Sequence, residues 1–267
     1  SRATPKIDPG VINLKTPEQL DQMAAAGKVH AGAIELAVEA AQPGATTESV
    51  DAAVEAYIRK SGGIPTFKGF RGFPGSICIS NNDMVVHGIP SDEVLTAGDT
   101  LSIDIGVTLG GWVADGAVTI PVGGESTVVA EQLMHVTKQS LFDAVEQCRP
   151  GNHLGDVGHA VEARVKTAGF SVIRELIGHG VGRNMHEEPQ VPNYGVPGAG
   201  PELQPGMVIA IEPMVNVGAP EIEVGDDNWS VYSADGSLTA HFEFTVAITE
   251  GGPRILTPWH EIVDVWS

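Results

Sequence analysis

The sequence predicts an α+β fold made of two related halves, each with two helices followed by strands. The first observation is the hydrophobic period, which changes from helical to alternating twice along the chain. The second is an internal repeat, because residues 43–56 resemble residues 150–163 at an offset of 107. A further match at an offset of 108 relates Asp104 to Glu212. Two matches at nearly one offset predict a duplication, with a site between the halves.

The first half begins with a clear helix signal. Thr16 is expected as the N-cap, Pro17 as the first helical residue, and Gln19 as the partner in a capping box. Pro43 and Gly44 end this helix. A second helix is expected from about Thr47 to Ser61, after which alternating strands are predicted at Ser76–Ser80, Met84–His87, Leu101–Val107 and Trp112–Pro121.

The second half repeats that order. Helices are predicted over residues 129–147 and 153–168. Strands follow at Phe170–Ile177, Val208–Glu212, Trp229–Ser233 and His241–Thr249. Residues 1–15 are expected to form a tail, and residues 16–267 a single domain with halves at about 16–125 and 126–250.

Composition excludes several classes of function. The chain has 267 residues, of which 42% are hydrophobic, so a sizeable core is expected. Its net charge of −19 opposes nucleic-acid binding as the main task. No apolar run approaches the roughly 20 residues that a membrane helix needs. Two cysteines, Cys78 and Cys148, are not expected to form a disulfide framework, and the first ten residues do not have the pattern of a signal peptide. The cytoplasm is therefore the expected location.

Two aspartates are predicted to meet on one hairpin. Asp104 lies in an apolar strand, where an unpaired carboxylate is costly. A two-residue turn at Gly110-Gly111 would pair Asp104 with Ala117 in the next strand. Asp115, two residues from Ala117, would then point to the same face as Asp104. Neighbouring carboxylates need a cation, although a register slip of one residue would separate them.

Two glutamates add to this pattern. Glu212 and Glu243 each stand alone in an apolar, strand-like run, with few basic residues nearby to pair them. Together with the two aspartates they predict a cation site. Carboxylates alone suit Mg²⁺ or Ca²⁺, whereas added imidazole shifts the preference to Mn, Fe, Co or Zn.

Three histidines are candidates for this site. His179 is surrounded by glycines in residues 178–182, where a backbone, metal or substrate can approach closely. His186 follows seven residues later, and His87 ends an apolar strand at a turn. We therefore expect imidazole nitrogen among the donors of the site.

The remaining histidines receive simpler interpretations. His241 precedes Glu243 by two residues and is a candidate for supporting the site from outside the ligand set. The others are assigned helical or terminal positions without a role: His30, His135, His153, His159 and His260. The chain has no G-x-S-x-G, Walker A or H-E-x-x-H motif, which argues against serine-hydrolase, P-loop and zincin chemistry.

Taken in order, these motifs resemble those of the type I methionine aminopeptidases, members of the pita-bread family. The resemblance runs from about Pro17 to Thr257. Its segments are Val86-His87-Gly88-Ile89-Pro90, Ser102-Ile103-Asp104-Ile105-Gly106, Asp115, residues 178–183, His186-Glu187-Glu188-Pro189, Ile211-Glu212-Pro213-Met214 and Phe242-Glu243-Phe244-Thr245. It implies a pita-bread fold, with curved antiparallel sheets covered by helices around a pseudo-two-fold axis.

The resemblance also implies a dinuclear metal centre. Its ligands would be Asp104, Asp115, His179, Glu212 and Glu243, with Asp115 and Glu243 bridging two divalent ions of Co, Mn, Fe, Ni or Zn. Glu212 would accept a proton from the attacking water and pass it to the leaving amine.

Further roles follow from the same resemblance. His186, together with the metals, would polarise the scissile carbonyl, and His87 would support the tetrahedral intermediate or the leaving nitrogen. Both histidines would touch the peptide. The methionine side chain would enter a pocket formed by Phe67, Phe70, Phe73, Cys78, Met185 and Trp229. The implied reaction removes the N-terminal methionine of peptides and nascent chains whose second residue is small. The resemblance also implies a monomer that contacts the ribosome transiently. Neither a membrane nor a nucleic acid is expected as a ligand.

Three residues depart from the family pattern, and two rival functions stay open. Phe244 stands where His is common, Gly116 where Thr or Ser is common, and Phe67 where Cys is found in bacterial members. Glu212 and Glu243 are only 31 residues apart, too close for the insertion of the type II enzymes. The rivals are a proline-directed peptidase and a non-enzymatic binding protein of the same fold.

Overall fold

The computed structural model describes residues 10–264. Its helices are α1 (Pro17–Ala40), α2 (Thr47–Lys60), α3 (Val128–Glu146) and α4 (Leu154–Thr167), with short 3₁₀ turns η1 (Phe70–Gly72), η2 (Val122–Gly124) and η3 (Trp259–Glu261). Its strands are β1 (Ile64–Pro65), β2 (Ile77–Asn81), β3 (Met84–Val86), β4 (Thr100–Leu109), β5 (Trp112–Pro121), β6 (Ser171–Val172), β7 (Gly178–Gly180), β8 (Glu187–Val191), β9 (Val208–Ile211), β10 (Met214–Asn216), β11 (Ile222–Val224), β12 (Val231–Ser233), β13 (Thr239–His241), β14 (Phe244–Thr249) and β15 (Gly252–Ile255). The α+β class predicted from the sequence is confirmed.

The first helix begins as the sequence predicts. The backbone N–H of Gln19 donates to Thr16 Oγ1 over 3.3 Å, and the N–H of Thr16 donates to Gln19 Oε1 over 3.0 Å. This reciprocal capping box satisfies two amide groups that the first turn leaves free. Lys15, just before the helix, is buried and ion-paired with Glu187 over 2.8 Å. Residues 1–9 of the predicted tail lie outside the described residues.

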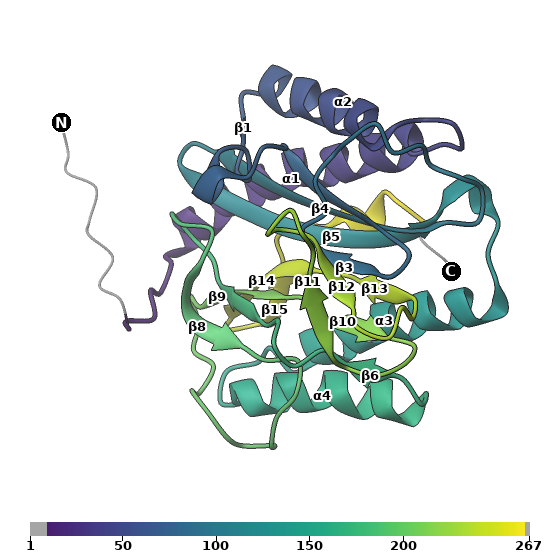
Figure 1. Cartoon of the computed structure of the whole chain (residues 1–267). Helices are drawn as coiled ribbons and strands as arrows, with labels where there is room; N and C mark the ends of the chain where they lie inside the picture. The colour runs from purple at the N-terminus through teal and green to yellow at the C-terminus, as the bar shows by residue number, and fades with distance from the viewer. Residues whose placement is uncertain (1–9, 265–267) are drawn as a thin grey trace.

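Two helix pairs enclose the strands. Figure 1 shows α1 and α2 on one side of the β-structure and α3 and α4 on the opposite side. Helix α1 contacts the long β4–β5 hairpin, whereas α3 contacts β9, β10 and β13. One hydrophobic core joins both layers, since Ile34 of α1, Ile103 of β4, Leu133 of α3 and Phe244 of β14 belong to the same buried cluster.

The strands form four antiparallel sheets. One has the order β1-β4-β2 with β5 paired to β4, and another has the order β15-β14-β9-β7-β8. The two smaller sheets have the orders β13-β10-β6 and β11-β12-β3. Among residues 10–264, no helix is both long and apolar enough to cross a membrane.

One predicted strand is divided in two. The sequence predicts a continuous strand over His241–Thr249, but β13 ends at His241 and β14 begins at Phe244. The chain pairs with β10 before the break and with β9 after it. Phe242 and Glu243 therefore lie where the chain passes from one sheet to another.

The glycine-rich segment around His179 is a strand rather than a loop. A Cβ on Gly178 would lie 2.2 Å from the carbonyl oxygen of Ala210, and one on Gly180 would lie 2.1 Å from that of Glu188. Only glycine lets β7 fit between its neighbours β8 and β9. The short strands near 172 and 231 likewise cover less of the chain than the alternating pattern predicts, because their neighbours are themselves only three residues long.

Candidate active site

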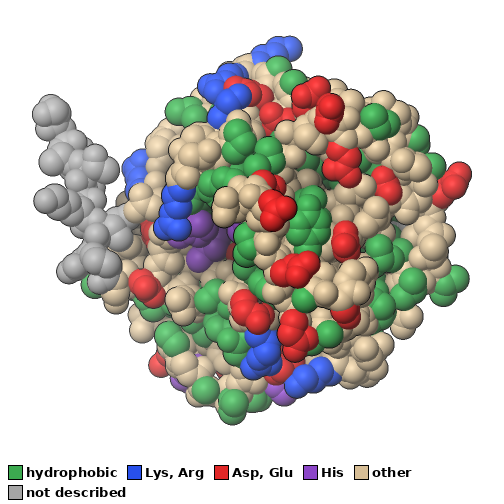
Figure 2. Space-filling model, in the orientation of Figure 1, with side chains coloured by type: hydrophobic (Ala, Val, Ile, Leu, Met, Phe, Trp, Pro, Cys, Tyr) green, Lys and Arg blue, Asp and Glu red, His purple; other side chains and the backbone are tan. Residues whose placement is uncertain are grey.

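A cavity of about 750 Å³ opens between the sheets and contains every residue predicted for the site. Its polar floor contains Asp104, Asp115, His179, Glu212 and Glu243. Its remaining predicted residues are His87, His186, Phe67, Phe70, Phe73, Cys78, Met185 and Trp229. In Figure 2 histidine side chains lie in a hollow, beside hydrophobic and basic side chains. The structure thus brings together residues that are far apart in the sequence.

The β4–β5 hairpin places the two aspartates. Its turn uses Gly110 and Gly111, both with positive φ (57° and 78°), which suits the mirror-image turns that join twisted strands. The resulting register pairs Asp104 with Ala117 and Gly106 with Asp115, as predicted. Both carboxylates consequently project from the same face of the hairpin toward the cavity.

The glutamates are placed by a crossing between two sheets. Ile211 pairs with Phe244 on one side of it, and Met214 pairs with His241 on the other. Residues 212–213 thus lie opposite residues 242–243, where the N–H of Phe242 donates to the carbonyl of Pro213 over 3.4 Å. Both dipeptides lie between named strands, and each contains one glutamate. We call these four residues the sheet crossing.

Direct hydrogen bonds join the hairpin to the sheet crossing. The N–H of Glu243 donates to the carbonyl of Ala117 over 2.9 Å, in an isolated antiparallel bridge. Thr245 Oγ1 accepts from the N–H of Asp115 over 3.1 Å and donates to its carbonyl over 2.8 Å. Trp259 Nε1 donates to the carbonyl of Glu243 over 2.8 Å. These contacts fix the backbones of Asp115 and Glu243 relative to each other.

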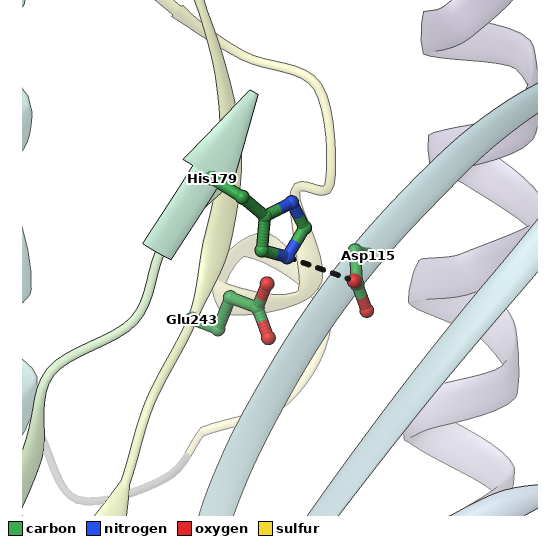
Figure 3. Close-up of side chains that lie close together, drawn as sticks. All are labelled: Asp115, His179 and Glu243. Atoms are coloured by element: carbon green, nitrogen blue, oxygen red, sulfur yellow. Dashed lines mark ion pairs between the residues drawn. The ribbon is translucent and has the colours of Figure 1, made fainter. Parts of the chain in front are cut away.

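His179 completes the cluster with a defined tautomer. Its Nδ1 lies 2.9 Å from the carbonyl oxygen of Gly180, which can only accept, so Nδ1 carries the proton. The unprotonated Nε2 lies 3.7 Å from Asp115 Oδ2 and 3.5 Å from Glu212 Oε1. Figure 3 shows His179 of β7, Asp115 of β5 and Glu243, from the segment between β13 and β14, directed toward one another. An imidazole lone pair and carboxylates around one point form a donor set for a transition metal.

The four carboxyl groups are held close together in a poorly solvated place. Burial raises the pKa of Asp115 to about 7. Burial, followed by the charge of Asp115, raises the pKa of Glu212, Glu243 and Asp104 well above their usual range. No lysine or arginine within residues 10–264 forms an ion pair with any of the four.

The polar atoms of this cluster fit divalent metal ions. Asp104 Oδ1, Asp115 Oδ1 and Glu243 Oε1 are buried and have no hydrogen-bond partner in the described part of the chain. One geometric group of donors is Asp115, His179 and Glu243, and a second is Glu212, His241 and Glu243. Cations would neutralise the repulsion and satisfy these oxygens.

Aromatic and sulfur-containing side chains form an apolar wall of the same cavity, and this wall adjoins the polar floor, because Cys78 pairs with Asp104 in the β2–β4 register. Phe67, Phe73, Cys78 and Met185 belong to one buried cluster, against which Phe70 and Trp229 pack. The rings of Phe73 and Trp229 meet edge to face with centroids 5.1 Å apart. Burial raises the pKa of the Cys78 thiol, so this cysteine lines the wall as a neutral group.

Two further histidines stand between the wall and the polar floor. His186 contacts His179 edge to face at 4.4 Å and Phe70 at 5.6 Å. His87 is exposed toward the cavity and has a left-handed backbone, with φ of 62°. Burial lowers the pKa of both imidazoles, so each is neutral near pH 7. A neutral imidazole can donate one hydrogen bond and accept another.

The sequence pattern marked His241 as a support from outside the ligand set, and Nε2 of His241 lies 3.7 Å from Glu212 Oε2. The same pattern missed two other residues around the site. It gave no role to His30, whose Nε2 donates to the carbonyl of Gly116 over 3.0 Å behind the hairpin. It also missed Arg71, which lines the cavity. Local pattern carries little signal for these contacts, because each joins segments distant in the sequence.

The three departures from the family pattern have structural explanations. Phe244 points away from Glu243, as alternation predicts, and stacks on Trp259 with centroids 4.6 Å apart. Gly116 has no space for a side chain, since a Cβ there would lie 2.7 Å from Cε1 of His30. Phe67 belongs to the apolar wall.

Comparisons with known proteins agree with this geometry. The profile of metallopeptidase family M24 matches residues 21–250. The chain belongs to metallopeptidase family M24. Methionine aminopeptidase 1 of Bacillus subtilis is 47% identical to the M24 chain over 247 residues, covering 92% of this chain and 99% of the relative. Methionine aminopeptidase 1 of Mycobacterium tuberculosis is 47% identical over 254 residues, covering 92% and 95%.

Solved structures support the pita-bread architecture of the M24 chain. The methionine aminopeptidase of Thermotoga maritima has a TM-score of 0.90 and 43% identity, covering 92% of this chain and 99% of that one. Prolidase from Pyrococcus furiosus has a TM-score of 0.71 and 24% identity, and the match covers 91% of this chain but 65% of that one. The second likeness shows the shared fold alone.

Proposed function

We propose that the M24 chain is an aminopeptidase that removes an N-terminal methionine when the second residue is small, using two divalent metal ions. The observation that carries the proposal is the composition of one cavity. Four carboxylates and an imidazole with a free Nε2 form its polar floor, and an apolar wall rich in aromatic rings and sulfur adjoins them. The names of its full-length relatives support the same activity.

The proposed metal ligands are Asp104, Asp115, His179, Glu212 and Glu243. Glu243 belongs to both groups of donors and Asp115 to one of them, and both residues are proposed to serve both metals. Divalent ions bound there would supply Lewis acidity and lower the pKa of a coordinated water. The metal is proposed to be Co, Mn, Fe, Ni or Zn, because the donors combine oxygen with imidazole nitrogen.

Glu212 is proposed to move the proton. Its side chain is 14% exposed, more than that of Asp115 or Glu243, so it reaches the cavity while remaining close to His179. A carboxylate whose pKa is raised by burial is matched to accepting a proton near neutrality and returning it to a leaving amine.

His186 and His87 are proposed to hold the peptide. His186 lies between His179 and Phe70, at the boundary between the polar floor and the apolar wall. It would donate to the scissile carbonyl oxygen, and His87 would stabilise the tetrahedral intermediate. These neutral donors would orient the peptide without adding positive charge.

The apolar wall is proposed to select methionine. Phe67, Phe70, Phe73, Cys78, Met185 and Trp229 offer contacts suited to an unbranched thioether. A missing or altered methylene costs only about 1–3 kcal/mol in such a pocket. Norleucine should therefore remain a substrate, whereas β-branched valine and charged lysine should be poor ones.

Peptide cleavage by the metal-loaded protein tests this proposal. We expect Met-Ala-Ser and norleucine-Ala-Ser to lose one residue, and chelation to abolish the reaction. Metal analysis before and after reloading with Co²⁺, Mn²⁺, Fe²⁺, Ni²⁺ or Zn²⁺ gives the stoichiometry and the preferred ion. Faster cleavage of Xaa-Pro peptides would instead identify a proline-directed peptidase, and binding of two metals without any cleavage would indicate a binding protein.

The proposed setting is the cytoplasm. Cys78 and Cys148 are both free and buried, as is usual for proteins of a reducing compartment. There the protein would act as a monomer on nascent chains, with transient ribosome contact. Sedimentation measures the oligomeric state, and pelleting with translating ribosomes measures the contact.

A further inference from the structure

His241 is a buried histidine whose ring nitrogens make no hydrogen bond within the described part of the chain. Its side chain is 1% exposed, and neither Nδ1 nor Nε2 has a hydrogen-bond partner among residues 10–264. Buried polar groups are normally satisfied, so an orphaned imidazole next to a binding site calls for an explanation. The proposed mechanism gives this residue no role.

The sheet crossing places His241 beneath both glutamates. His241 is the last residue of β13 and pairs with Met214, the first residue of β10. Beyond this pair, the two antiparallel segments contain Glu212 and Glu243, and they pair again at Ile211 and Phe244. The Nε2 atom of His241 lies 3.7 Å from Glu212 Oε2 and 3.8 Å from Glu243 Oε2. Both distances are within about 1 Å of a hydrogen bond.

Glu212 lies between two imidazoles that face different oxygens. Its Oε1 lies 3.5 Å from Nε2 of His179, whereas its Oε2 faces His241. The proton of His179 is fixed on Nδ1 by the carbonyl of Gly180. No acceptor fixes a proton on Nδ1 of His241 within the described residues, and two carboxylates face its Nε2. The proton of His241 therefore belongs on Nε2, the reverse of His179.

We propose that His241 is a positioning residue whose single Nε2–H is shared between Oε2 of Glu212 and Oε2 of Glu243, holding both carboxylates in their metal-binding orientation. The inference rests on the proposed function, because it assumes that these glutamates hold metal. His241 is not among the residues that line the cavity, so it acts from behind the carboxylates. Such supporting hydrogen bonds typically change metal affinity by about 10–100-fold.

Two substitutions distinguish the effect of the N–H donor from the effect of the volume of the ring. His241→Gln keeps an N–H donor of similar reach, and His241→Met keeps a similar volume without a donor. Val215→Ala is the matched control, because Val215 is equally buried on β10, the strand paired with β13, but lies outside the sheet crossing and does not line the cavity. Zn²⁺ affinity by calorimetry should fall 10–100-fold in His241→Met and stay within a few-fold of the parent in the other two. Equal affinity in His241→Met, or an equal loss in His241→Gln, would overturn the proposal.

The tautomer gives a test that needs no variant. In the Zn²⁺-loaded protein, ¹⁵N NMR of labelled histidine should show His241 protonated on Nε2 and His179 protonated on Nδ1. An unprotonated, metal-bound Nε2 on His241 would make it a ligand and refute the positioning role. Because neither readout uses peptide cleavage, an inactive protein that shows both results would count against the proposed reaction alone.

Discussion

The β4–β5 hairpin and the sheet crossing each deliver two carboxylates to the cavity, but they hold them differently. In the hairpin, a ladder ten residues long on each strand fixes Asp104 and Asp115 by alternation from a single turn. At the crossing, Glu212 and Glu243 lie where strand pairing stops and resumes in another sheet. The hairpin is defined by neighbours in sequence, and the crossing by contacts with distant segments.

The aspartates and the glutamates should therefore respond differently to substitutions nearby. Backbone pairing fixes Asp104 from both sides, through β2 and β5, and Asp115 from one side, through β4, so their positions tolerate change nearby. The glutamates depend on individual supports such as Trp259, Ala117 and His241. Substitutions at the crossing should therefore alter chemistry and metal binding, whereas substitutions in the hairpin turn should alter stability alone.

The largest effect is expected at Glu212. Glu212→Gln removes the proposed proton carrier without changing its shape, and general acid–base catalysis is worth roughly 10²–10⁴-fold. We expect kcat, measured in steady-state assays at saturating metal, to fall by at least about 10²-fold. The metal-free variant should stay folded, since a buried carboxyl beside Asp115 becomes neutral. A parental kcat would show that the proton moves through another group.

Stability should depend on pH in opposite ways with and without metal. The folded-state pKa of Asp115 is raised from 3.8 to about 7, so the metal-free native state binds more protons than the unfolded chain within this interval. Its free energy of unfolding should fall as pH rises from about 4 to about 7. Saturating Mn²⁺ should reverse the slope, because protons then compete with the metal. Calorimetry at several pH values, with chelator or Mn²⁺, measures both slopes; a flat metal-free curve would contradict the buried-charge argument.

A moderate effect is expected behind Glu243. Phe244→His replaces the ring that stacks on Trp259, the residue that holds the carbonyl of Glu243. We expect metal affinity to change by about 10–100-fold while the number of bound metals stays the same. Phe142→Leu is a suitable control, since the ring of Phe142 meets Phe244 edge to face, with centroids 5.5 Å apart, whereas Phe244 stacks on Trp259. If the parent bound one metal and Phe244→His bound two, position 244 would belong to the metal site itself.

The smallest effect is expected in the hairpin turn. Gly110 has a φ of 57° and open space where a Cβ would lie, so Gly110→Ala adds only backbone strain of about 1–2 kcal/mol. Gly110→Asn should cost less, because asparagine tolerates this conformation. Denaturant titration measures the loss, and metal affinity should remain parental in both variants. A fall in metal affinity would show that the turn, and not the ladder, sets the register of the aspartates.

The same contrast explains what the sequence could predict. The hairpin register, the capping box at Thr16 and the α+β class follow from local rules of turns, caps and periodicity. The lone acids in apolar runs identified Glu212 and Glu243 as candidates. The break after His241 could not be predicted, because it depends on β9 and β10 belonging to different sheets. The strand at His179 was missed since its glycines are required by Ala210 and Glu188, which are distant in sequence.

The hydrogen bonds between Asp115 and Thr245 have a consequence for biosynthesis. They join residues 130 apart in the sequence, and Trp259 adds its bond to Glu243 later still. Closing so long a loop is slow and entropically costly compared with forming the hairpin. While the chain is being synthesised, β4 and β5 can pair and place Asp104 and Asp115. The metal-binding cluster then still lacks Glu212 and Glu243. The enzyme therefore becomes competent only after nearly all of its own sequence has left the ribosome.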